Sequence, residues 1–140
     1  MPRSASSIRH IVRNLKLEYE GCSLEDIIRD RKIILLYIDD LEVDGAYGKF
    51  DILFGNGVSI SKQFIFINSK LDYYKRSCVL AHELGHFALH RDEPNQTTNS
   101  LYIDDTKLEY EATTFAMQLI GNKKYMTDYI SPQFCEFISK

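Results

Sequence analysis

Two histidines and a glutamate near the middle of the chain have the types and spacing needed for metal-assisted hydrolysis. They are His82, Glu83 and His86, in the run His82-Glu83-Leu84-Gly85-His86. Four residues make about one turn of an α-helix, so the two histidines lie on one side of such a helix and can bind one Zn²⁺ ion at about 2.0–2.1 Å. Glu83 is turned away by about 100° and lies near a water on the metal, where it can act as general base.

The residues around this motif indicate that its helix is buried. Apolar side chains occupy nearly all the remaining positions from Cys78 to Leu89. A helix that is apolar almost all round lies in a protein core. Histidine and glutamate side chains are costly there without partners, and a metal ion with its water provides such partners. A chance motif made of ordinary core histidines is the less favoured alternative.

His90 ends the same run of residues, and its position argues against a role as third metal ligand. A two-histidine site needs one more protein ligand and keeps the fourth position open for water. His90 lies eight residues after His82, which is roughly 12 Å along a helix axis. One ion does not easily bridge that span from a straight helix. We therefore interpret His90 as the C-terminal residue of the helix, where a charged imidazole complements the helix dipole.

Two glutamates further along the chain are better candidates for the third ligand. Glu109 shares its predicted helix face with small residues three, four and seven positions later, whereas Glu111 shares its face with bulkier side chains. A face of small residues lets one helix approach another closely, and a carboxylate needs this approach to reach the histidines. The pattern favours Glu109 as the ligand and leaves Glu111 as the alternative.

N-terminal helices and a small sheet are expected to position these residues. Helical periodicity starts at Ile8 and again after Ser23, whose hydroxyl can cap the second helix. Three extended segments follow, at residues 33–38, 46–54 and 58–67, and the first is long enough for a buried strand. Gly55-Asn56-Gly57 supplies the tight turn of a hairpin between the last two. We expect these segments to form a three-stranded antiparallel sheet.

The histidine motif belongs to one long predicted helix, from Leu71 to His90. The helix ends before Pro94, which disfavours helical backbone at the residue before it. A polar loop at residues 95–100 leads to a helix over residues 107–120, and Ser131-Pro132 begins a short last helix. Helices, strands and helices in this order predict an α+β fold, in a single domain over residues 1–140.

Composition excludes several other classes of protein. The chain has 140 residues, of which 44% are hydrophobic and 26% charged, as in ordinary globular proteins. Its net charge of −3 does not suit direct binding to nucleic acid. No apolar run approaches the ~18 residues of a membrane span, and the polar N-terminus is unlike a signal peptide. We expect a cytoplasmic protein whose cysteines, Cys22, Cys78 and Cys135, are buried thiols.

Together these motifs resemble the ImmA/IrrE family of zinc metallopeptidases. The resemblance rests on residues 80–90, which read L-A-H-E-L-G-H-F-A-L-H, and on the E-x-E-A-x-x-F-A segment at residues 109–116. The apolar segment at residues 64–68, which leads into the motif helix, also fits the family's pattern. The similarity covers residues 23–119, which is most of the chain, and it implies a zincin-like minimal metalloprotease domain.

The resemblance implies Zn²⁺ as cofactor, with His82, His86 and Glu109 as ligands and Glu83 as general base. Position 113 departs from the family's pattern, because Thr113 stands where Asn or Asp is usual as a hydrogen-bond partner of a histidine. A threonine hydroxyl can still make such a bond, although a weaker one.

Members of this family are often encoded in prophages or mobile elements, and they cleave or otherwise inactivate a cognate helix-turn-helix repressor, which derepresses its genes. The resemblance therefore implies a zinc-dependent endopeptidase with a repressor protein as substrate and no direct contact with nucleic acid. The substrate could pair as an added strand with the sheet edge at residues 46–54. Two alternatives stay open: a zinc-containing anti-repressor that binds without cleavage, and a zinc hydrolase for a small molecule. Glu83 argues against the first, because a purely structural site does not need this carboxylate.

Overall fold

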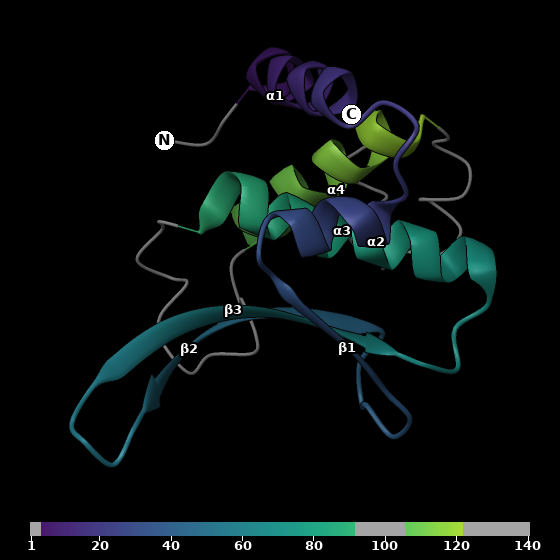
Figure 1. Ribbon diagram of the computed structural model, residues 1–140. Helices are drawn as coiled ribbons and strands as arrows, with labels where there is room; N and C mark the ends of the chain where they lie inside the picture. The colour runs from purple at the N-terminus through teal and green to yellow at the C-terminus, as the bar shows by residue number, and fades with distance from the viewer. Residues whose placement is uncertain (1–3, 92–105, 122–140) are drawn as a thin grey trace.

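A computed structural model of the protein describes residues 4–91 and 106–121 (Figure 1). The elements in these ranges are α1 (Ala5–Glu18), α2 (Leu24–Asp30), β1 (Ile34–Ile38), β2 (Gly45–Leu53), β3 (Ser59–Asn68), α3 (Tyr73–His90) and α4 (Thr106–Ile120). They confirm the expected α+β fold. The predicted loop at residues 95–100 and the predicted helix at Ser131-Pro132 lie outside the described residues. None of the described helices has the length and apolar character needed to cross a membrane.

The two N-terminal helices begin and pack as the sequence predicts. α1 buries Ile8, Val12 and Leu15, which recur at helical spacing. α2 starts with a capping box, in which the Ser23 hydroxyl accepts from the Asp26 amide at 3.1 Å and the Asp26 carboxylate accepts from the Ser23 amide at 3.3 Å. These reciprocal bonds explain why the helix begins at this point of the chain.

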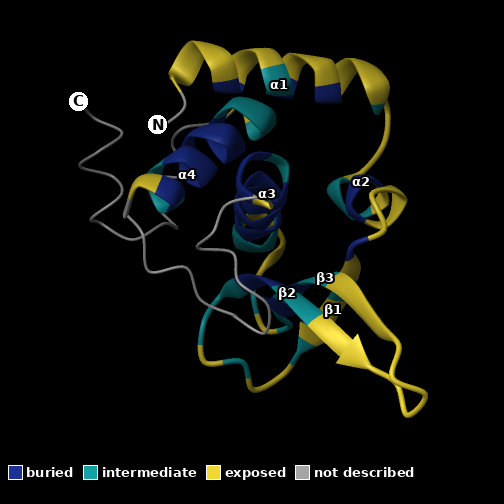
Figure 2. Ribbon diagram, turned by 90° about the vertical axis from the view of Figure 1, so that its left-hand side faces the viewer, coloured by how far each residue is buried: buried dark blue, intermediate teal, exposed yellow. Residues whose placement is uncertain are grey.

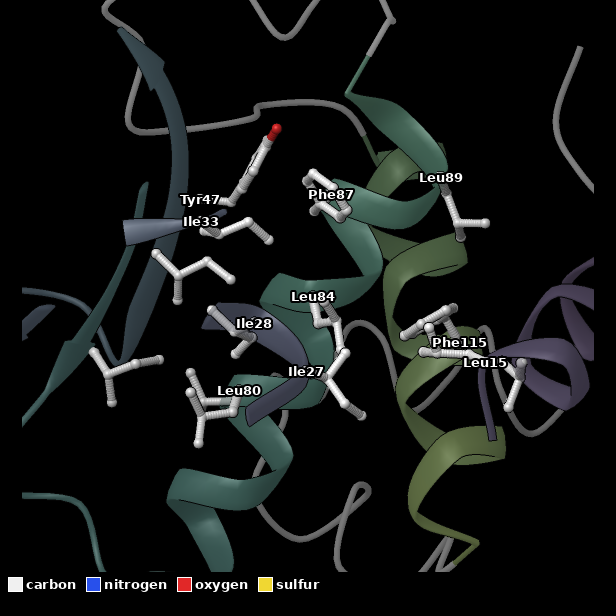
Figure 3. Packing of buried hydrophobic residues seen from close by; sticks show 14 of the residues in the cluster. Leu15, Ile27, Ile28, Ile33, Tyr47, Leu80, Leu84, Phe87, Leu89 and Phe115 are labelled. Carbon is white, nitrogen blue, oxygen red and sulfur yellow. The ribbon is translucent and has the colours of Figure 1, made fainter. Parts of the chain in front are cut away.

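The helices cover one face of the sheet (Figure 2); α3 lies between the sheet and the helices α1 and α4, and α2 lies beside α3 and contacts β1. Every residue of α3 from Cys78 to His90 is buried except Ala88, which confirms the expected buried helix. Figure 3 shows side chains from the four described helices and from the sheet converging on one cluster. Its members include Leu15, Ile28, Tyr47, Leu84 and Phe115.

The sheet is mixed rather than antiparallel, which corrects the prediction. β3 is the central strand; it pairs antiparallel with β2 and parallel with β1. The predicted β2–β3 hairpin is present, and Gly57 at its turn has a φ of +86° that favours glycine. The prediction failed at β1 because residues 39–44 are not a hairpin turn. The backbone amide of Asn68 donates to the carbonyl oxygen of Asp44, just before β2, and that of Ser69 donates to the carbonyl oxygen of Ile38 at the end of β1. The end of β3 therefore lies between the two strands.

The expectation that the first strand is buried was also wrong. β1 is an edge strand, and its Ile34 and Leu36 side chains are 37% and 42% exposed. Alternate residues of a strand point to opposite faces, so these two side chains lie on the face that the described helices leave uncovered. A run of apolar residues alone does not show which face of a strand is covered.

The cysteine prediction is confirmed at only one position. Cys78 is buried in α3, and this burial raises the pKa of its thiol to about 11. Cys22 is exposed in the turn between α1 and α2, where no packed neighbour encloses it, so the expectation was wrong there. Cys135 lies outside the described residues.

Candidate metal centre

α3 and α4 approach each other closely at Gly85. A Cβ atom at this position would lie 3.0 Å from the carbonyl oxygen of Ala112 and 3.0 Å from a ring carbon of Phe115. The small residues Ala112 and Ala116 of α4 are fully buried. The prediction that a face of small residues brings these helices together is therefore confirmed.

Replacing Gly85 with Ala is expected to destabilise the protein by about 1 kcal/mol. The added methyl group meets the α4 backbone and a buried ring, and such overpacking costs about 1–3 kcal/mol, which outweighs the roughly 1 kcal/mol gained from the higher helix propensity of alanine. Urea denaturation of the metal-free protein measures the change. Gly55→Ala is the matched control, because a Cβ there meets nothing within 4 Å. A Gly85→Ala variant as stable as this control would contradict the prediction.

The carboxylate of Glu109 in α4 reaches both histidines of the motif. Its Oε2 lies 2.7 Å from His82 Nε2, and its Oε1 lies 3.1 Å from His86 Nε2. The two imidazole rings are on the same side of α3, with centroids 4.9 Å apart. The structure thus brings together the three residues that the sequence predicts as metal ligands.

The Nδ1 atoms of His82 and His86 contact further polar side chains. Thr113 Oγ1 lies 3.1 Å from His82 Nδ1. His90 Nδ1 lies 3.1 Å from His86 Nδ1, and His90 Nε2 lies 2.9 Å from Glu111 Oε1. All three partners are buried. The hydrogen bond expected of Thr113 is therefore present.

His90 and Glu111 have a place that the sequence reasoning missed. His90 is the last residue of α3, as predicted, but it is only 1% exposed, and both of its ring nitrogens contact neighbouring side chains. Glu111, the alternative ligand, contacts His90 and not the Nε2 atoms of the motif. The available signal was the spacing of His90, which follows His86 by one helical turn.

Comparison with known proteins agrees with this arrangement. The family described as the IrrE N-terminal-like domain, a peptidase family, matches residues 29–135. The chain belongs to the ImmA/IrrE family.

Two relatives illustrate how far this ImmA/IrrE relationship extends. "Metallopeptidase ImmA" of Bacillus subtilis (strain 168) is 27% identical over 126 residues, which cover 89% of this chain and 69% of that protein. "Uncharacterized immunity region protein 2" of Bacillus phage phi105 is 36% identical over 74 residues, which cover 51% of this chain and 46% of the phage protein. The chain thus matches about half the length of the phage relative. No solved structure matches the chain. The matching family is a peptidase family, and the Bacillus subtilis relative is named a metallopeptidase.

Glu83, the glutamate of the ImmA/IrrE motif, lies beside the two histidines. Nitrogen and oxygen atoms of His82, Glu83 and His86 that can bind a metal lie within 4.8 Å of one another. Burial raises the pKa of Glu83 to about 7; the positive charge of His82 lowers this pKa and the negative charge of Glu109 raises it further. A carboxyl group that titrates near neutrality suits both the uptake and the release of a proton.

The charges in the site favour a cation between the histidines and Glu109. Burial raises the pKa of Glu109, but the hydrogen bonds and charges of the two histidines outweigh this effect and hold the pKa well below its usual range. Burial lowers the pKa of His82, and the carboxylates of Glu109 and Glu83 outweigh it, so this pKa is raised. Burial lowers the pKa of His86 to about 4 despite the contact with Glu109. Two imidazole nitrogens and one carboxylate are also the donor set of a catalytic zinc site.

Proposed function

We propose that the protein is a zinc-dependent endopeptidase that cleaves a cognate helix-turn-helix repressor and so derepresses genes of a phage or mobile element. The observation that carries the proposal is the contact of one carboxylate, Glu109, with the Nε2 atoms of both His82 and His86, next to a fourth group, Glu83. His82, His86 and Glu109 would hold Zn²⁺. A structural site does not need Glu83, whereas a hydrolytic site does.

The residues of the chain have distinct roles in the proposed reaction. Zn²⁺, if held by His82, His86 and Glu109, would act as a Lewis acid toward the scissile carbonyl group and the attacking water. Glu83 accepts the proton of the attacking water and passes it to the leaving amine nitrogen. The pKa of about 7 at Glu83 suits both transfers, because the group changes its protonation state without a large free-energy cost.

Strand β2 is the proposed binding edge for the substrate. It lies at an edge of the described sheet, on the side that packs against α3. The ring of Tyr47 in β2 contacts Phe87, the residue after His86, with centroids 6.4 Å apart, and Lys49 Nζ lies 3.3 Å from the carbonyl oxygen of Arg91. An extended peptide can pair with such an edge by main-chain hydrogen bonds. This supports the prediction that residues 46–54 present the edge.

A repressor is the substrate that the relatives favour. The name of the phage relative refers to an immunity region, and that of the Bacillus subtilis relative to a metallopeptidase. The net charge of −3 suits an effect on DNA exerted through a protein substrate. A repressor acts on DNA in the cytoplasm, which is where this activity would take place.

The direct test mixes the zinc-loaded protein with the helix-turn-helix repressor that is encoded next to the gene of this protein. We expect new fragments whose masses add up to the repressor plus one water, as measured by intact-protein mass spectrometry. A chelator should abolish these fragments and added Zn²⁺ should restore them. Release of the repressor from operator DNA without any fragment would contradict cleavage and favour the anti-repressor alternative.

A further inference from the structure

We infer that His90 and Glu111 form a positioning pair, which holds the imidazole of His86 with its Nε2 lone pair toward the metal. The inference rests on the proposed metal site. His90 Nδ1 lies 3.1 Å from His86 Nδ1, and His90 Nε2 lies 2.9 Å from Glu111 Oε1. His90 and Glu111 are 1% and 4% exposed, so water does not compete freely for these bonds.

The direction of the hydrogen bonds follows from the chemistry of their ends. An ionised carboxylate only accepts, so Glu111 accepts the proton of His90 Nε2. An Nε2 atom that binds a metal carries no proton, so the one N–H of a neutral His86 is at Nδ1 and donates to His90 Nδ1. His90 Nδ1 then accepts, which leaves the N–H of His90 at the nitrogen that faces Glu111. The bare Nε2 of His86 is the atom that faces Glu109.

The other histidine of the motif is held in a different way. His82 Nδ1 contacts the hydroxyl of Thr113, which can donate or accept and therefore does not impose one tautomer. At His86 the carboxylate of Glu111 acts through the ring of His90 and favours a proton on His86 Nδ1. Partners of this kind orient metal-binding histidines, and their loss typically lowers metal affinity about 10–100-fold.

A double-mutant comparison of zinc affinity tests the pair. The variants are Glu111→Gln, His90→Gln and the two combined, with Glu20→Gln as an exposed control. We expect each single change to weaken zinc binding about 10–100-fold in a chelator competition, and the double change to weaken it no further, because the residues act in series. Additive losses, or affinities equal to that of wild type, would overturn the inference. Urea denaturation of the metal-free proteins separates loss of fold from loss of metal.

Nitrogen-15 NMR of the histidine side chains gives a test in the unaltered protein. In the zinc-loaded protein we expect His86 to carry its proton on Nδ1 and His90 to carry its proton on Nε2. A proton on His90 Nδ1, or zinc bound through His86 Nδ1, would overturn the inference even if a variant fails to fold. Neither measurement depends on the repressor. A protein that shows this tautomer but cuts no repressor contradicts the proposed function alone.

Discussion

A Glu83→Gln variant is expected to cleave the repressor about 10²–10⁴-fold more slowly than wild type while it keeps its zinc. This is the range typical of general acid–base groups. Glutamine has nearly the same shape as glutamate but cannot take up a proton from water. The ligands His82, His86 and Glu109 are unchanged, so the zinc content should not fall. Cleavage rates followed by mass spectrometry, together with elemental analysis for zinc, measure both quantities.

The matched control for this variant is Glu20→Gln, which makes the same chemical change on an exposed side chain. It should cleave at the wild-type rate. A Glu83→Gln variant that cleaves as fast as this control would rule out Glu83 as general base. A variant that no longer cleaves but still releases the repressor from its operator would show that binding alone carries the regulatory effect.

The second large effect is expected at Glu109, where replacement by Gln should remove zinc. The carboxylate contacts both Nε2 atoms, so its loss leaves two ligands and no negative charge between them. The loss of affinity should exceed the roughly 10–100-fold that is typical for an outer partner. Elemental analysis after dialysis against a weak chelator measures the zinc that remains.

Glu111→Gln is the control variant for Glu109→Gln. The same change two positions away, on the carboxylate that contacts His90, should leave more zinc bound than Glu109→Gln does. The opposite order would identify Glu111 as the ligand, which is the alternative that the sequence leaves open. Equal and complete retention of zinc in both variants would contradict both assignments.

Local signals explain why the helices and the hairpin were predictable. The cap at Ser23, the turn at Gly57 and the burial of residues 78–90 each depend on neighbours within a few positions of the chain. The order of the strands in the sheet does not depend on such near neighbours. It depends on the pairing of β1 with β3 and on the bonds made by Asn68 and Ser69, which join segments far apart in sequence.

In the candidate site, too, some residues could be identified from local sequence signals and others could not. One helical turn places His82 beside His86, and the small residues near Glu109 indicate close packing of its helix, so these residues could be found from spacing. The spacing argument judged His90 only by its distance from His82. It overlooked the contact with His86 one turn away, and Glu111, 21 residues further along the chain, could not be paired with His90 before the fold was known.

The division of the site between two helices also has a consequence for folding. The histidines belong to α3 and Glu109 belongs to α4, and Glu109 follows His82 by 27 positions. A metal ion bound to both would be a reversible cross-link that closes this loop. A ligand that binds only the folded state stabilises it, because unfolding then requires release of the ligand as well. The supply of metal would then determine how much of the protein is folded as well as how much is active.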